Sequence, residues 1–269
     1  MRRFIHIVIF SALFSLQLAA QKVDTLYSGL KKASSFIVLN ETIYVVESGN
    51  HRVLKLDLDG KLIEKYGNRG GGNYQFDNPV SIASSTGLKI FISDLGNNRI
   101  QVFDKRWQYL SSITGNKKFQ TKDEIEPSYL GVNKLGEIIF YDAKSKSFGR
   151  YNEDGTYLDQ IPIPSEIKSV QGFQVSGDKL FILDNKSGFV HRLSGNGFYE
   201  TFYPAKGVSN FQFVNGKMIL VQIDKMNMSQ LNSSDSRVIA IENPTQGIFK
   251  NEKFLYLLTS KELIRVALR

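Results

Sequence analysis

The 269-residue chain predicts an all-β fold, a six-bladed β-propeller of four-stranded antiparallel blades. Three observations predict it: a hydrophobic pattern that recurs along the chain, strand-like alternation inside each unit, and turn residues between the strands. The repeat is clearest between Ile43–Gly67 ("IYVVESGNHRVLKLDLDGKLIEKYG") and Ile90–Thr114 ("IFISDLGNNRIQVFDKRWQYLSSIT"). A period near 40 residues with four strands per unit is typical of propellers.

The spacing of the units gives their number. Weaker copies of the pattern begin at Ile138, Leu180, Met218 and Phe254. The period is marked by the residue that ends the first strand of each of these sequence copies, which is the second strand of the complete unit: Glu47, Asp94, Asp142, Asp184, Gln222 and Thr259. The steps between them are 47, 48, 42, 38 and 37 residues. Six such units fill residues 21–269 and leave no room for a second domain.

Each unit contains four strands in order. A short apolar strand comes first: "SFIVL", "VSIAS", "YLGVN", "GFQVS", "NFQFV" and "GIFKN" in the six units. The third strand alternates between apolar and polar residues, as in "VLKLDL" and "IQVFDK", which indicates one buried face. Asp59-Gly60, Asp154-Gly155 and Asn196-Gly197 then predict two-residue hairpin turns before the fourth strand, because such turns need positive φ.

The two ends of the chain complement each other. The last unit stops at "LIRVALR" and lacks a fourth strand, whereas Val23–Gly29 ("VDTLYSG") is a strand without a unit. We therefore expect this N-terminal strand to complete the last blade and close the ring, which leaves neither terminal edge open.

The N-terminus has the features of a secretory signal. A positive start, Met1-Arg2-Arg3, precedes the apolar run Phe4–Ala20, which ends in small residues. We expect a signal peptide at residues 1–20, cleavage after Ala20, and a secreted or periplasmic protein with no transmembrane segment left. The alternative is that the run stays as a membrane anchor. The chain has no cysteine, which excludes disulfides and thiol catalysis.

The formal net charge is +8, and +6 without Arg2 and Arg3. The lysines are scattered rather than clustered in one run, which favours a soluble basic protein over a nucleic-acid binder. Export also argues against an intracellular nucleic-acid partner.

The glycine-rich run "GNRGGGNYQFDNP" (Gly67–Pro79) could be a phosphate-binding loop or a corner between two blades. No helix is predicted after it, so no helix N-terminus would point at a phosphate. It also lacks the Gly-Lys-Ser/Thr of a P-loop. We therefore expect a blade corner, with Phe76 filling the crevice between blades.

These motifs resemble those of NHL-repeat propellers. The resemblance rests on "ESGNHRV" (Glu47–Val53), "DLGNNRI" (Asp94–Ile100) and the intervening "GGGNYQFDNP", and it covers Ile43–Ser112. It implies an NHL-type propeller over residues 21–269. Some NHL-type propellers are lyases with zinc held by several histidines, but His51 and His191 are the only histidines outside the signal, so we expect no such metal site.

The recurring pairs Glu47–Arg52 and Asp94–Arg99 share an offset of five, which indicates corner-tying ion pairs rather than catalysis. Strand direction places the turns between second and third strands on the same face as the inter-blade loops, and loops on a rigid scaffold commonly bind ligands. The candidate ligand-binding residues on this loop face are His51, Arg52, Arg69, Tyr74, Asn98, Arg99 and Lys117. Such side chains suit a protein, peptide or glycan.

We expect an exported, monomeric, non-catalytic binding or scaffold propeller that recognises a polar ligand on its loop face and needs no cofactor. The alternative is a calcium-dependent hydrolase, lactonase or lyase acting in the central channel. Carboxylate and amide side chains are available for calcium, although no sequence pattern arranges them: Asp77, Asn78, Asp123, Glu126 and Asn210.

Overall fold

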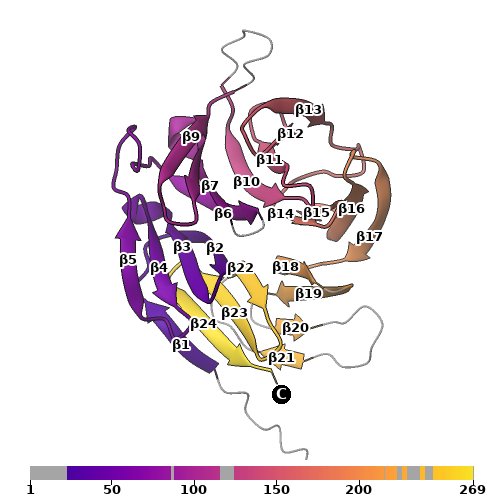
Figure 1. Ribbon diagram of the computed structural model, residues 1–269. Coiled ribbons are helices and arrows are strands. Elements are labelled where there is room, and N and C mark those ends of the chain that lie inside the picture. Colours follow the sequence, from indigo (N-terminus) through magenta and orange to yellow (C-terminus); the bar gives the residue numbers. More distant parts are fainter. Residues whose placement is uncertain are drawn as a thin grey trace, which may run out of the picture.

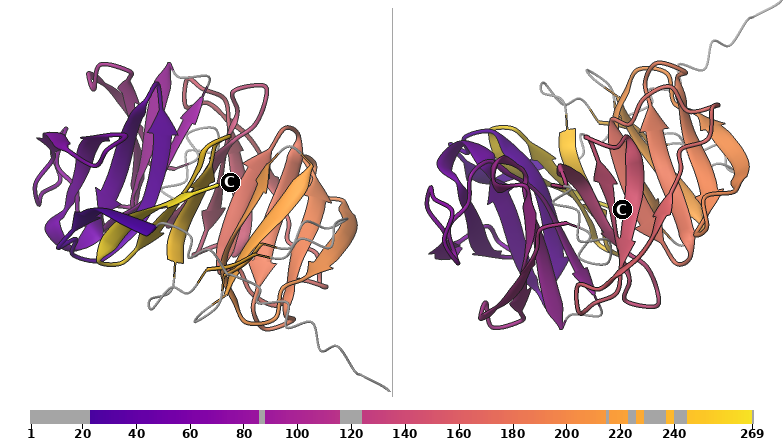
Figure 2. Two further views of the ribbon diagram at one scale, coloured as in Figure 1. Left: turned by 90° about the horizontal axis from the view of Figure 1, so that it is seen from below. Right: turned by 90° about the horizontal axis from the view of Figure 1, so that it is seen from above.

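A computed structural model describes residues 23–85, 88–115, 124–214, 216–222, 226–228, 237–239 and 245–268. These residues form an all-β propeller whose sheets surround a common centre (Figure 1). Viewed at right angles to this direction, the sheets stand side by side around the centre (Figure 2). Within these residues there is no helix of sufficient length and apolar character to span a membrane.

Five sheets have four antiparallel strands each. The first two are β2 (Ala33–Leu39), β3 (Thr42–Glu47), β4 (Arg52–Asp57), β5 (Leu62–Tyr66), and β6 (Pro79–Ser85), β7 (Lys89–Asp94), β8 (Arg99–Asp104), β9 (Tyr109–Ile113). The next two are β10 (Pro127–Val132), β11 (Ile138–Asp142), β12 (Ser147–Tyr151), β13 (Tyr157–Ile161), and β14 (Gly172–Ser176), β15 (Lys179–Asp184), β16 (Phe189–Ser194), β17 (Tyr199–Pro204). The fifth combines β1 (Val23–Ser28) with β22 (Thr245–Lys250), β23 (Phe254–Thr259) and β24 (Glu262–Ala267). Single-turn 3-10 helices η1 (Ser48–Asn50) and η2 (Leu95–Asn97) follow β3 and β7.

The expectation of six four-stranded blades needs correction, because the described residues form five. Between β17 and β22 the chain forms two two-stranded sheets instead, β18 (Val208–Val214) with β19 (Lys217–Gln222), and β20 (Met226–Met228) with β21 (Arg237–Ile239). The sequence gives a physical reason. The stretch 224–236, "DKMNMSQLNSSDS", lacks the apolar alternation and the Gly-containing hairpin turn of the other units.

The pairing expected between the two ends of the chain is present. β1 lies antiparallel to β24, with Val23 opposite Val266 and Ser28 opposite Glu262. The order of this sheet is β1-β24-β23-β22, so the N-terminal strand is its outermost member. The outer edge of β24 is therefore covered by hydrogen bonds rather than exposed.

The core lies mainly between neighbouring sheets. Phe76 is 1% exposed and packs in one cluster with Val46 and Val53 of the first sheet and Ile90 of the second. The expectation that Phe76 fills the crevice between blades is confirmed. No helix follows the glycine-rich run, which joins β5 to β6 as a corner.

The hairpin turns differ in detail from the two-residue turns that we expected. Gly60 has φ of +83°, but Asp59 is not in the left-handed region. The Gly60 amide donates to the Asp57 carbonyl, the Asp57 amide donates to the Lys61 carbonyl, and the strand register shifts next to the turn. Each turn therefore contains one more residue, with glycine at the bulge position.

In the second sheet Trp107, with φ of +61°, takes the place of that glycine. Its side chain is 3% exposed and contacts the rings of Tyr44 and Tyr66 in the first sheet and of Phe103 in its own. The left-handed backbone at a large residue is unfavourable. The burial of the indole between two sheets compensates for it.

Candidate functional site

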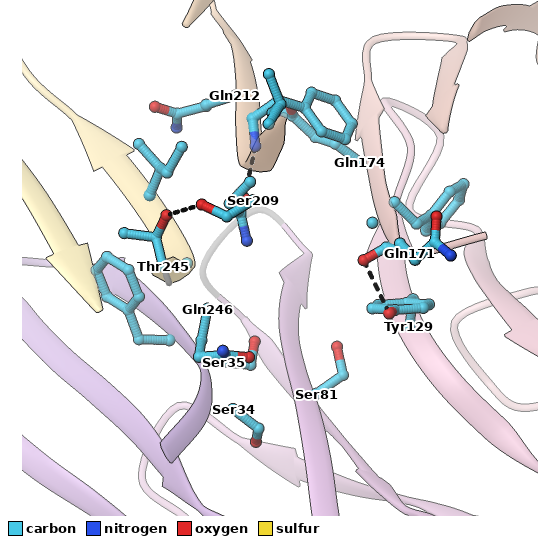
Figure 3. A pocket seen from close by; sticks show the side chains of 18 of the residues that line it. Ser34, Ser35, Ser81, Tyr129, Gln171, Gln174, Ser209, Gln212, Thr245 and Gln246 are labelled. Atoms are coloured by element: carbon cyan, nitrogen blue, oxygen red, sulfur yellow. Dashed lines mark hydrogen bonds between the residues drawn. The ribbon is translucent and has the colours of Figure 1, made fainter. Parts of the chain in front are cut away.

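The centre of the propeller contains a cavity of about 630 Å³. Its walls come from the first residues of the innermost strands, β2, β6, β10, β14, β18 and β22, with one residue from the turn after β15. The polar side chains from these strands point toward one another across the cavity (Figure 3). Because the lining lies where the inner strands begin, the cavity is nearest to the face that carries the inter-blade loops, which we call the loop face.

The described lining has no charged side chain and no histidine. It combines hydroxyl and amide groups with apolar and aromatic side chains. The hydroxyl and amide residues are Ser34, Ser35, Ser81, Tyr129, Gln171, Gln174, Asn185, Ser209, Asn210, Gln212, Thr245 and Gln246. The volume lies within the usual range of small-ligand pockets, roughly 300–1,000 Å³.

Some of these polar groups serve the protein itself. Each inner strand is an edge strand, so its backbone N–H groups lack a strand partner on the side of the cavity. The Ser35 hydroxyl accepts from the Ile82 amide at 3.4 Å, and the Ser81 hydroxyl accepts from the Leu130 amide at 3.1 Å. Gln174 spans to β18 with two hydrogen bonds, from its Nε2 to the Phe213 carbonyl and to its Oε1 from the Phe213 amide.

Other polar groups of the lining are left for a ligand. The Gln212 side-chain carbonyl is buried and accepts no hydrogen bond from any described residue. Gln246 and Asn185 are exposed at the cavity and make no side-chain hydrogen bond to another described residue. An unsatisfied buried acceptor costs about 1–3 kcal/mol. A ligand that donates a hydrogen bond to Gln212 would recover this free energy.

The loop face is organised by acids at the ends of the second strands. Glu47 accepts the Lys31 amide, Asp94 accepts the Asp77 amide, Asp142 accepts the Glu126 amide, and Asp184 accepts the Lys168 amide, all at 2.7–2.9 Å. Each acid thereby anchors the loop that leads into its own sheet. The repeated acids of the sequence are therefore structural.

The two recurring arginines act in the same corners. Arg52 Nε lies 2.5 Å from Glu47 Oε2, and Arg99 Nε lies 2.9 Å from Asp94 Oδ2. Arg99 also donates to the carbonyls of Gly71, Gly72 and Gln75, so that one buried side chain holds the glycine-rich corner. The interpretation of both pairs as corner-tying ion pairs is confirmed.

The other predicted ligand-face residues lie around this corner and not in the cavity. His51 is half-buried: its Nδ1 accepts the Asn78 amide at 3.2 Å and lies 3.4 Å from Asp77. The Arg69 side chain is 76% exposed, 3.7 Å from the same carboxylate. Tyr74 is exposed and accepts the Tyr109 amide through its hydroxyl.

Asn98, at φ of +50°, donates weakly to Glu124 at 3.4 Å. Lys117 lies outside the described residues. The structure thus gathers His51, Arg69 and Tyr74 near one blade corner, but none of the six described candidate residues lines the central cavity. The signal that could have found the cavity was present in the first strands, where Ser81, Gln174 and Gln212 interrupt otherwise apolar runs.

His191 lies in β16, the third strand of its sheet, and is buried beside Ser187 and Tyr199. Its Nε2 is 3.1 Å from the Ser187 hydroxyl, and its Nδ1 is 2.9 Å from the Tyr199 hydroxyl. Burial lowers the pKa of His191, against an opposing effect of Asp184, which is 3.6 Å away. Because the Ser187 hydroxyl donates to the Asp184 carbonyl and the imidazole is 3% exposed, this group is not an accessible nucleophile–base pair.

Asp184 is fully buried in the same corner. Burial acts to raise the pKa of Asp184, but hydrogen bonds from the Ser169 hydroxyl, the Lys168 amide and Ser187 outweigh it and lower that pKa to about 2. The carboxylate is therefore ionised and satisfied by the protein at neutral pH.

The described oxygen groups considered for calcium do not assemble into one site. Asp77 and Glu126 belong to loop corners, Asn210 lines the cavity, and Asp123 lies outside the described residues. The described residues contain no group of three or more His, Asp or Glu side chains that could hold a metal ion. Calcium prefers six to eight oxygen ligands that include carboxylates. The described lining does not fit that requirement.

Fold and cavity together define a β-propeller with an uncharged central pocket. Comparisons with known proteins agree with this class. Residues of the chain are 36% identical over 66 positions to human "NHL repeat-containing protein 3", a match that spans 23% of this chain and 19% of that protein. No protein-family model matches the chain.

Two solved structures share the fold. A gluconolactonase from Xanthomonas campestris has a TM-score of 0.71 at 15% identity, over 94% of this chain and 92% of that one. Virginiamycin B lyase from Staphylococcus aureus has a TM-score of 0.64 at 13% identity, over 92% and 99%. That structure is of a catalytically inactive variant, in which a histidine is replaced by alanine, with quinupristin. At these identities the likeness concerns the fold alone.

Proposed function

We propose that the protein is an exported, non-catalytic binding propeller that holds a polar ligand in its central cavity, at the loop face. The observation that carries this proposal is the composition of the cavity. Hydroxyl and amide groups converge there from all six inner strands, and the described lining contains no carboxylate, histidine, lysine or arginine. Such a lining suits recognition by hydrogen bonds: Tyr129 is its one titratable described side chain, burial raises the pKa of that phenol, and no described lining residue could act as a base to activate the serine and threonine hydroxyls.

We further propose that the ring has six blades, that it is closed by β1, and that it is of NHL type. The pairing of β1 with β24 supports closure. Contacts between successive inner strands, from β2 through β6, β10, β14, β18 and β22 back to β2, support six positions, the fifth being that of β18–β21. The local similarity to the human NHL protein supports the family. Export rests on the apolar segment Phe4–Ala20.

The second candidate function is a lactonase or lyase. It is favoured by the overall likeness to gluconolactonase and to virginiamycin B lyase. In virginiamycin B lyase, replacement of a histidine by alanine gives a catalytically inactive variant. Here His191 is buried away from the cavity and His51 lies at a blade corner, so the described lining provides no histidine for such a role.

The test uses protein expressed from the complete sequence. Gln212→Leu with Gln246→Leu removes two amides that hold no other described residue, so we expect an unchanged fold and lost binding of soluble peptides or oligosaccharides in calorimetric titrations. Gln108→Leu, in a turn on the opposite face, is the matched control and should bind normally.

Incubation with lactones and with a streptogramin B antibiotic, with and without added calcium and chelator, tests the second candidate. Turnover that survives purification and is lost with the chelator would replace the binding proposal. Absence of both ligand binding and turnover would also count against it.

A further inference from the structure

The two faces of the propeller carry different charge. On the loop face, the described parts of the segments that link the sheets or join second to third strands contain nine basic residues: Lys31, Lys32, Arg69, Lys144, Lys146, Lys168, Lys186, Lys206 and Lys261. The same described segments contain four acids: Asp77, Glu124, Glu126 and Glu166. This face is therefore basic.

The opposite face is formed by the turns between first and second strands and between third and fourth strands. Its described turns contain more acidic than basic residues. Its described turns hold five basic residues: Lys61, Lys105, Arg106, Lys134 and Lys253. They hold seven acids: Glu41, Asp59, Glu137, Glu153, Asp154, Asp178 and Glu252. Among the described turns and linking segments, the excess of positive charge thus lies on the side from which the cavity is reached.

The corner acids Glu47, Asp94 and Asp184 are engaged with donors other than lysine ammonium groups. Glu47 and Asp94 are buried and paired with arginines. Asp184 is buried, and its oxygens accept the backbone amides of Lys168 and Lys186, among other donors, rather than their ammonium groups. The backbone of each lysine is thereby fixed at the corner, while its side chain is exposed.

Several of these lysines are neighbours of the cavity lining in the chain. Lys31 and Lys32 precede the lining residue Ser34, and Lys186 directly follows Asn185. Lys168 comes three residues before Gln171, and Lys206 directly precedes Gly207. An uncharged, hydrogen-bonding interior is thus bordered by cationic side chains.

We infer that the ligand is an acidic oligosaccharide. This inference rests on the proposed binding function and names its ligand class. A sugar body presents many hydroxyl donors, which the unsatisfied Gln212 carbonyl and the amides of Gln246 and Asn185 can accept. The ring of Phe173, which lines the cavity and is only partly buried, offers apolar contact to a sugar face. Carboxylates or sulfates at the periphery of the ligand would lie near the lysines, where attraction raises the association rate.

The test compares three probes by calorimetry at low and physiological salt: hexagalacturonate, neutral cellohexaose and a poly-glutamate peptide. We expect hexagalacturonate to bind most tightly and to weaken as salt increases. Lys31→Gln with Lys186→Gln should raise its Kd by roughly three- to tenfold, because each exposed ion pair contributes modestly. Lys61→Gln with Lys253→Gln removes the same charge from the opposite face and should leave Kd within twofold.

The outcomes separate this inference from the proposed function. If cellohexaose binds as tightly as hexagalacturonate, and Gln212→Leu with Gln246→Leu abolishes both, the binding function stands and the acidic class is overturned. If only the peptide binds in the cavity, the ligand class is also overturned. Equal effects of the two lysine pairs would show general charge attraction and would overturn the role of the loop face. If no probe binds in a cavity-dependent manner, the inference and the proposed function both fail.

Discussion

Replacement of Arg99 by methionine tests whether this side chain holds the glycine-rich corner. Methionine keeps the apolar stem and removes the guanidinium. The substitution eliminates the ion pair with Asp94 and the three hydrogen bonds to the carbonyls of Gly71, Gly72 and Gln75. The corner that contains Phe76 would then lose its main polar attachment to the second sheet.

The expected loss follows from burial. Asp94 is fully buried, and removal of one partner of a buried ion pair costs about 3–5 kcal/mol. Asp94 keeps the hydrogen bonds from the Asp77 amide and Asn97, and the freed carbonyls can bind water. These contacts place the loss near the lower limit, at about 3 kcal/mol in the free energy of unfolding.

Urea denaturation followed by circular dichroism measures this loss. Arg69→Met, in the same corner, is the matched control: its side chain is 76% exposed and should change the free energy of unfolding by less than about 0.5 kcal/mol. A loss below about 1 kcal/mol for Arg99→Met would refute the structural role. Normal stability combined with lost ligand binding would instead assign Arg99 to the ligand, as the loop-face prediction proposed.

Four further results are expected. Deletion of β1 (Val23–Ser28) should lower the unfolding midpoint of the whole protein, because β24 loses its partner, and an unchanged midpoint would contradict this pairing. Trp107 is the only tryptophan and is 3% exposed between two sheets. Its fluorescence emission should shift to the red in the same urea range as the circular dichroism change. A red shift at lower urea would mean that this interface opens before the rest of the protein unfolds. Since burial lowers the pKa of His191, the unfolded chain binds more protons than the folded protein below pH of about 6.5. The free energy of unfolding should therefore fall as pH decreases from there through the lowered pKa. His191→Gln should flatten this pH dependence, and an unchanged slope would exclude His191 as its source. The pKa of Asp184 is lowered to about 2, so its ionised carboxylate contributes stability above pH of about 4 that is lost as pH falls toward 2. Asp184→Asn should therefore remove the acid sensitivity in that window. An acid transition that this substitution leaves unchanged would contradict the role of Asp184 in the corner.

Much of the architecture was predictable because it repeats. The spacing of Glu47, Asp94, Asp142 and Asp184 located the ends of second strands, and the structure places all four in equivalent corners. Repetition fails where the sequence diverges. The unit after β17 lacks alternation, and only two pairs of strands are formed by its described residues.

The cavity was not predicted, for a physical reason. Its lining takes one or a few side chains from each of six strands that lie far apart in the sequence, so no local motif marks it. Motif reasoning instead selected Arg52 and Arg99, whose recurrence reflects the needs of the corners. A polar residue that interrupts a short apolar inner strand is the weaker but more informative signal.

The hydrogen bonds between neighbouring inner strands run in one direction around the ring. The Ser35 hydroxyl of the first sheet accepts the Ile82 amide of the second, and the Ser81 hydroxyl of the second sheet accepts the Leu130 amide of the third. Gln174 likewise serves Phe213 in the strand that follows its sheet. At these junctions, a side chain of one unit thus satisfies a backbone amide of the next unit along the chain. A duplicated or deleted unit would have to match two different neighbours, one that it completes and one that completes it, so changes in unit number are constrained even where the repeats look alike.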